Sequence, residues 1–161
     1  MTLAYRLTPK VRIDDLAMQY NQDVKYGVHV NAPGGSAKDG PSAGSCITTI
    51  VFSLLTGRPI RARFAATGEI QLDGKITAIG GLELKILGSL KAGVTDYCYP
   101  VENQRDFDKF SEKHGETDEV IAARFHAVET IDELIGLMVM DERTIDIPVD
   151  DVGIESPASS P

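Results

Sequence analysis

The chain has 161 residues and a net charge of −8, with 42% hydrophobic and 25% charged residues, a composition typical of one globular domain with a full hydrophobic core. The acidic charge argues against binding to nucleic acid, which needs a basic face, and against docking on an anionic membrane surface. No apolar run approaches the roughly 20 residues that cross a membrane, and the N-terminus lacks the apolar segment of a secretory signal.

The first quarter of the chain predicts a helix, a strand and a loop. Residues 1–10 carry a weak pattern that fits either a strand or an extended lead-in. Residues 11–22 have apolar side chains at helical spacing and predict a helix. Residues 26–30 alternate and are rich in β-forming side chains, which predicts a strand. Residues 31–41 contain three glycines and two prolines and predict a loop.

The most apolar run of the chain follows that loop. Residues 43–56 predict a helix that ends at Gly57, and its apolar side chains lie nearly all round the helix. We therefore expect other elements to cover this helix on most sides. Further strands are predicted at 63–72 and 75–79, joined by a hairpin turn at Asp73–Gly74, at 95–99, and within 120–128. Further helices are predicted at 82–91 after a break at Gly80–Gly81, from a cap at Asn103 to His114, and from a cap at Thr130 to Met140.

This alternation of strands and helices predicts the α/β class, layered in the α+β manner, with helices packed on a mixed sheet. The sheet is expected to be mixed because the hairpin adds an antiparallel pair. We expect one domain over residues 1–140, with 1–10 as its lead-in. Residues 141–161 are acidic and rich in serine and proline at the end, which predicts a disordered tail.

The two cysteines, Cys46 and Cys98, lie in apolar stretches and have no partners at metal-ligand spacing. Two thiols do not make a disulfide framework. We interpret them as buried free thiols, which indicates the cytoplasm or another reducing intracellular compartment.

The loop before the apolar helix carries a candidate nucleophile, Ser42. Its glycines first suggest a phosphate cradle, but the Walker pattern needs a lysine where Pro41–Ser42 stands, and the dinucleotide pattern is not met either. A serine at a helix N-terminus can attack a carbonyl whose oxyanion is held by free N–H groups. The alternative is that Ser42 is an ordinary helix cap.

A serine nucleophile needs a base to take its proton. The three histidines are His29, His114 and His126, and nothing in the sequence selects one of them. A lysine can serve only where burial disfavours its charged form. Lys85 has mostly apolar neighbours and follows a glycine turn, so it is a candidate base, with a solvated position on an amphipathic helix as the alternative.

Several segments resemble the Lon protease proteolytic domain. Residues 38–44 (KDGPSAG) resemble the nucleophile motif of that family, and residues 79–85 (IGGLELK) resemble the motif that carries its lysine. The resemblance covers roughly residues 27–140, and several motifs in the right order are far more specific than any one of them. Other segments that follow the family's pattern are 53–59, 67–75, 100–103 and 120–140.

The resemblance implies a serine endopeptidase that uses a Ser–Lys dyad to hydrolyse peptide bonds in unfolded or flexible protein segments. Ser42 matches the family's nucleophile and Lys85 its general base. The supporting residues implied by the resemblance are Thr67, which helps to position the lysine amine, Asp39, which lies close to the serine and gates the oxyanion site, Gly40, whose N–H helps to hold the oxyanion, and Glu69, beside the threonine and without a settled role.

The resemblance also implies the partners. We expect protein or peptide substrates, a homo-oligomer that is hexameric in this family, and no nucleic acid or membrane partner. No cofactor or metal is expected in this chain, and ATP would enter only through an ATPase module or a separate ATPase partner, because the sequence has no Walker motif. The glycine-rich β segment that opens the family's domain is not recognisable here, so we expect a shortened form. The alternative function is a non-catalytic Lon-like assembly or scaffold domain, which would have no reason to keep both Ser42 and Lys85.

Overall fold

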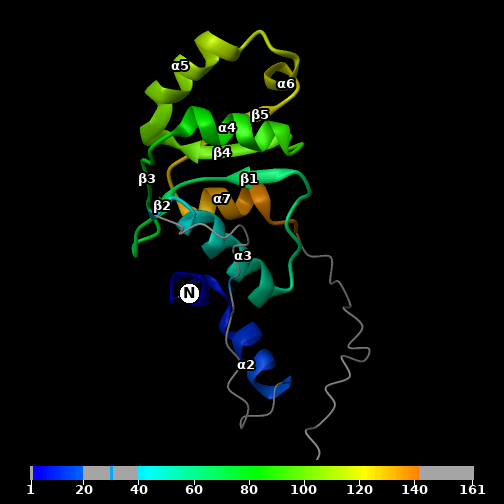
Figure 1. Ribbon diagram of the computed structural model, residues 1–161. Coiled ribbons are helices and arrows are strands. Elements are labelled where there is room, and N and C mark those ends of the chain that lie inside the picture. Colours follow the sequence, from blue (N-terminus) through cyan, green and yellow to red (C-terminus); the bar gives the residue numbers. More distant parts are fainter. Residues whose placement is uncertain (1, 20–29, 31–39, 142–161) are drawn as a thin grey trace, which may run out of the picture.

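The structure is a computed structural model that describes residues 2–19, 30 and 40–141. At its centre is a sheet of three parallel strands in the order β1-β4-β5 (Figure 1). The middle strand, β4, is buried over its whole length because it has a neighbour on either edge and helices on both faces. The strands are β1 at Phe64–Ala66, β4 at Asp96–Pro100 and β5 at Arg124–Val128.

A second, smaller sheet pairs β2 at Glu69–Ile70 antiparallel with β3 at Ile76–Thr77. The α/β class is confirmed, but the parallel and antiparallel pairings occur in two sheets and not within one mixed sheet. The strand predicted over 63–72 is accordingly divided between them. The division falls at Thr67–Gly68, where the chain leaves β1 and hydrogen bonds to a different part of the molecule.

Helices cover both faces of the parallel sheet (Figure 1). On one face lie α4, Leu82–Lys91, and α5, Gln104–His114. On the other lie α3, Gly44–Thr56, and α7, Ile131–Met138. These four helices and the hairpin turn confirm the elements that the sequence predicts most strongly.

The two faces of the sheet carry separate hydrophobic cores, and β4 contributes to both because its side chains alternate. Tyr97 and Tyr99 pack into the α4–α5 core, in which Phe110 is also fully buried. Cys98 points the other way, into the α3–α7 core. The members of the α4–α5 core are Leu82, Ile86, Tyr97, Tyr99 and Phe110, and those of the α3–α7 core include Leu3, Ala4, Val51, Phe52, Ile76, Cys98, Val128, Ile131, Leu134 and Met138.

The apolar helix α3 ends at Gly57 as predicted, in the left-handed conformation with φ of 67°. It contacts α1, α2, α7, β1 and β2, so most of its surface is covered. One strip is not covered: Ile50 and Leu54 remain 49% and 62% exposed. The prediction that other elements cover α3 on most sides is therefore confirmed. The exposed strip is narrow, because its two residues lie one helical turn apart on the same face.

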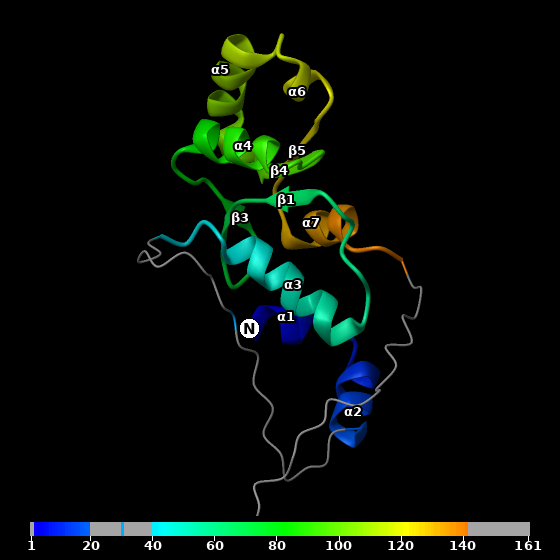
Figure 2. The same cartoon turned by 45° about the vertical axis from the view of Figure 1, so that its right-hand side comes forward.

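The expectation of a strand or extended lead-in over residues 1–10 is wrong. This segment forms α1, Thr2–Leu7, followed at Pro9 by a turn into α2, Lys10–Gln19. Leu3 and Ala4 are buried against α3, as Figure 2 shows α1 lying along that helix. Tertiary packing decides this segment, because its own pattern is too short and weak to specify a helix.

The second half of the chain follows the prediction with two additions. A single 3-10 turn, η1 at Val101–Asn103, precedes α5, and a short helix, α6 at Asp118–Ile121, precedes β5. The cap at Thr130 is confirmed, since its side chain accepts a hydrogen bond from the Glu133 N–H at 3.3 Å.

No helix in the described residues is long and apolar enough to cross a membrane. The predicted strand at 26–30, apart from Val30, and the loop up to residue 39 lie outside the described residues.

Candidate active site

The loop that carries Ser42 is fixed by the chain that leaves β1. The Ser42 carbonyl oxygen accepts two hydrogen bonds, from the Gly68 N–H at 2.9 Å and from the Thr67 hydroxyl at 3.2 Å. The Ser45 N–H in turn donates to the Gly68 carbonyl at 3.1 Å. The first turn of α3 is therefore attached to the point where the parallel sheet ends. The N-cap of α3 is Ala43, so Ser42 stands one residue outside the helix and is not its cap.

Glycines permit this close approach of loop and strand. A Cβ at Gly68 would overlap the Ile76 methyl Cγ2, and one at Gly44 would lie 2.9 Å from Ile70 Cγ2. Gly40 has a φ of 86°, in the left-handed region that favours glycine, and turns the chain toward Ser42. The residues around Ser42 thus have steric reasons to be small that are independent of any chemistry.

Lys85 lies in the first turns of α4, on the face of the parallel sheet opposite α3, and its side chain reaches Ser42. Its Nζ donates a hydrogen bond to Ser42 Oγ at 3.1 Å, across 43 positions of sequence. The flanking Leu82 and Ile86 are fully buried in the α4–α5 core, which fixes the helix, while Lys85 itself is half-buried. Gly81, with φ of 70°, makes the turn from which the helix starts. The sequence thus brings together the two residues that the dyad hypothesis needs.

The pair lies at the carboxyl edge of the parallel sheet. Thr67 and Gly68 come directly after the last residue of β1, and α4 begins beyond the same edge. Open α/β sheets bind their ligands at this edge. The N-terminus of α3 also opens here, and the positive end of its dipole favours negative charge, although the Gly44 and Ser45 N–H groups already donate to the Pro41 and Gly68 carbonyl oxygens. The Gly40 and Ser42 N–H groups donate to no other residue in the part of the chain that the structure describes.

Of the supporting residues, Thr67 lies beside the dyad, and Glu69 makes its side-chain hydrogen bond within the small sheet. Thr67 is buried beside the dyad, but its hydroxyl bonds to the Ser42 carbonyl oxygen, and among the described residues it makes no hydrogen bond to the Lys85 amine. Glu69 lies two residues further on in β2, where its carboxylate accepts a hydrogen bond from Gln71 at 3.4 Å. Asp39 lies outside the described residues.

The described histidines are paired elsewhere. His114 Nε2 lies 2.9 Å from Glu83 Oε1, and His126 Nε2 lies 3.3 Å from Asp96 Oδ1. Neither contacts Ser42 among the described residues. The choice of base that the sequence leaves open therefore narrows, within this part of the chain, to Lys85.

One residue near the site is missed by sequence reasoning. Asn103 precedes α5 as predicted, but its side chain makes no capping hydrogen bond. It bonds instead to the backbone of Ile79, ahead of the glycine turn that leads to Lys85. The spacing from Asn103 to Asp106 imitates a capping pair, which is why the sequence favours the wrong role; no local pattern could have indicated a partner 24 residues away.

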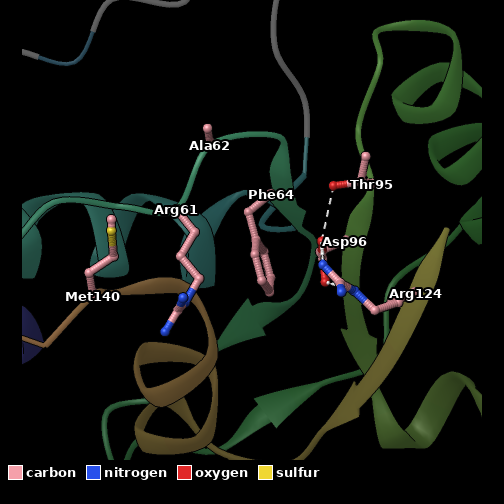
Figure 3. A pocket seen from close by; sticks show the side chains of 7 residues that line it. All are labelled: Arg61, Ala62, Phe64, Thr95, Asp96, Arg124 and Met140. Atoms are coloured by element: carbon pink, nitrogen blue, oxygen red, sulfur yellow. Dashed lines mark hydrogen bonds and ion pairs between the residues drawn. The ribbon is translucent and has the colours of Figure 1, made fainter.

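A pocket of about 300 Å³ lies at the opposite, amino edge of the sheet (Figure 3). The first residues of the three parallel strands, Phe64, Asp96 and Arg124, line it. Figure 3 shows the Arg124 guanidinium turned onto the Asp96 carboxylate, which it binds through two hydrogen bonds of 2.7 Å. Asp96 and Arg124 therefore satisfy each other, and Arg61 donates to the Leu137 carbonyl oxygen, so this pocket is a weaker candidate site than the Ser42–Lys85 pair.

The Asp96 ion pair predicts how stability depends on pH. The two hydrogen bonds from Arg124 hold the pKa of the Asp96 carboxyl well below its usual range. A lowered pKa in the folded state stabilises the fold above the unfolded value of about 3.9, and the stabilisation is lost as the pH falls below it. We expect Asp96→Asn to lower the free energy of unfolding at pH 7 by about 1–3 kcal/mol and to flatten its fall below about pH 4.

Urea denaturation at a series of pH values measures both effects. Glu112→Gln, at an exposed position of α5, is the control and should change the free energy of unfolding by less than about 0.5 kcal/mol. An Asp96→Asn protein with wild-type stability at pH 7 would show that the ion pair contributes nothing.

Comparison with known proteins adds independent information. Residues 4–141 match the family model described as the Lon protease (S16) C-terminal proteolytic domain. The chain is similar to the Lon protease of Haemophilus influenzae, with 40% identity over 128 residues, which cover 79% of this chain and 15% of that protein. It is similar to the Lon protease of Escherichia coli K12, with 38% identity over 135 residues, which cover 83% of this chain and 16% of that protein. The chain thus spans about one sixth of the length of the curated relatives it matches.

Proposed function

We propose, because the chain belongs to the family of Lon protease C-terminal proteolytic domains, that it is a serine endopeptidase acting on unfolded or flexible protein segments. The observation that carries the proposal is the hydrogen bond of 3.1 Å from Lys85 Nζ to Ser42 Oγ. A nucleophile and a base at this distance are the minimum that acyl transfer requires.

The proposed reaction begins when the neutral Lys85 amine accepts the proton of the Ser42 hydroxyl. Ser42 Oγ attacks the scissile carbonyl carbon, and the N–H groups of Gly40 and Ser42 hold the oxyanion that forms. The lysine then gives its proton to the leaving amine as the peptide bond breaks. Water, deprotonated by the same amine, hydrolyses the acyl-enzyme and restores the serine.

Thr67 and Gly68 support this reaction through the backbone. Their two hydrogen bonds fix the Ser42 carbonyl oxygen, so they hold the orientation of the residue that carries the nucleophile. We propose this backbone role for Thr67 in addition to a contact with the lysine amine. The gating role of Asp39 and a role for Glu69 beside the threonine remain parts of the proposal.

The proposed setting follows the relatives. The proposal includes assembly into a homo-oligomer, hexameric as in the family, and an ATPase module or partner that supplies unfolded substrate, with no cofactor of this chain's own. It places the peptidase unit in residues 1–140 and the protein in the cytoplasm or another reducing compartment, which suits its two free thiols, Cys46 and Cys98.

Covalent labelling tests this function. The protein is treated with a fluorophosphonate, which reacts with activated serines, and the modified peptide is identified by mass spectrometry. We expect modification at Ser42, and its loss in a Lys85→Ala variant that remains folded by circular dichroism. A folded wild-type protein that is not modified at Ser42 would contradict the peptidase and favour the assembly domain.

A further inference from the structure

A buried amide holds the chain segment that leads to Lys85. Asn103 is only 3% exposed, and its side chain engages both backbone groups of Ile79. The Asn103 Oδ1 accepts from the Ile79 N–H at 2.9 Å, and the Nδ2 donates to the Ile79 carbonyl oxygen at 2.9 Å. The side chain thus pairs with Ile79 as a neighbouring strand would, although no strand lies there.

Two acidic residues complete this arrangement. Asp106 accepts a second hydrogen bond from Asn103 Nδ2 at 2.8 Å, which fixes the orientation of the amide. Glu102 accepts from the Ala78 N–H at 3.0 Å and forms an ion pair with Lys75 at 3.1 Å. The turn η1 therefore holds two consecutive backbone N–H groups of the connection between β3 and α4.

Ile79 is six positions before Lys85, and little separates them except the turn that starts α4. Gly81 has a left-handed φ of 70°, and its carbonyl oxygen accepts the Lys85 N–H at 3.2 Å. The place of Ile79 thus sets where α4 begins and hence where the Lys85 side chain starts. Glycines at 80 and 81 have no side chain with which to hold this turn themselves.

Both halves of the dyad depend on β4. The Cys98 carbonyl oxygen in β4 accepts from the Thr67 N–H at 3.1 Å, and Thr67 in turn holds the Ser42 carbonyl. The same strand continues through Pro100 directly into η1 and Asn103. Strand β4 therefore connects the two residues: Thr67 links it to Ser42, and Asn103 links it to the segment that leads to Lys85.

We propose that Asn103 is a positioning residue of the Ser42–Lys85 pair, which holds the lysine amine within hydrogen-bond distance of the serine. The inference of an effect on turnover rests on the proposed function, whereas the geometric inference does not. A displacement of about 1 Å at a reacting group can lower a rate about 100-fold. An asparagine that served only the stability of the fold would leave the pair coupled in every molecule that remains folded.

The first test compares Asn103→Ala with Thr130→Ala, which removes the side-chain cap of α7 and so also destabilises the fold. The Thr130 contact with Lys75 is a backbone bridge, which alanine keeps. With unfolded casein as substrate and below the unfolding temperature of both variants, we expect kcat of Asn103→Ala to fall 10-fold to 100-fold and KM to change less than about 2-fold. Thr130→Ala should keep kcat within about 2-fold of wild type.

A second variant guards against misfolding. Asn103→Asp has the same size and keeps the acceptor for the Ile79 N–H, but it loses the donor to the Ile79 carbonyl and to Asp106. Its second carboxylate oxygen would face the Ile79 carbonyl oxygen and the Asp106 carboxylate, which repel it, so we expect its kcat to fall at least as far as that of Asn103→Ala. If kcat in either folded Asn103 variant equals that of Thr130→Ala, the positioning role is overturned.

The second test needs no turnover. The NMR resonance of the Lys85 side chain, 13C-labelled at Cε, is compared with and without Ser42→Ala, in wild type and in the folded Asn103 variants. We expect Ser42→Ala to shift this resonance in wild type and to shift it by less than half as much in the Asn103 variants. An equal shift in both backgrounds contradicts positioning. A shift present in wild type without any Ser42-dependent cleavage leaves positioning standing and refutes the peptidase.

Discussion

Ser42→Ala is expected to lower kcat for cleavage of an unfolded protein by about 10⁴-fold or more. Removal of a nucleophile ends covalent catalysis, and what remains is the stabilisation of the transition state by the oxyanion donors and by binding. The Ser42 loop is held in the fold by hydrogen bonds to the Ser42 carbonyl oxygen, which alanine keeps. The variant should therefore stay folded, and its KM should change little. Cleavage of fluorescent casein measures the rate, and circular dichroism measures the fold.

Ser111→Ala, on the exposed side of α5, is the matched control and should cleave at the wild-type rate. A folded Ser42→Ala variant that retains more than about a hundredth of the wild-type kcat would show that another residue carries the reaction.

Lys85→Met is expected to lower kcat by about 10²-fold to 10⁴-fold, the usual contribution of a general base. Methionine keeps the unbranched apolar stem and removes the amine that donates to Ser42 Oγ. Lys85→Arg should be equally inactive, because a guanidinium does not give up its proton in proteins.

Lys91→Met, in the last turn of the same helix and exposed, should leave kcat within about 2-fold of wild type. Activity that survives in Lys85→Arg would exclude a lysine base.

The site is predictable from the sequence to the extent that its parts are short motifs. The loop and the glycine turn leave Ser42 and Lys85 as candidates, the resemblance to the Lon proteolytic domain selects them, and the structure brings their side chains within hydrogen-bond distance. Periodicity likewise predicts α4 and α7, whose apolar side chains recur at helical spacing, and the apolar run that ends at Gly57 predicts α3.

The parts that could not be predicted depend on contacts between distant segments. Residues 2–7 form a helix because Leu3 and Ala4 have an apolar surface on α3 to cover, which no local pattern reveals. The strand predicted over 63–72 breaks at Gly68 because that residue must lie against Ser45 and Ile76. Asn103 has a plausible local role as a cap, and only the fold shows that its partner is Ile79.

The segments that carry the two members of the proposed dyad pack into different hydrophobic cores, and this has a consequence for when the proposed activity can arise. Ser42 leads into α3, on one face of the sheet, and Lys85 extends from α4, on the other. During synthesis the serine leaves the ribosome first, and the proposed base can reach it only after β4 has paired with β1 and both cores have formed. Local opening of either layer likewise separates the pair. Under the proposed mechanism, a nascent or partly unfolded chain therefore carries a serine without its base and does not yet cleave other chains.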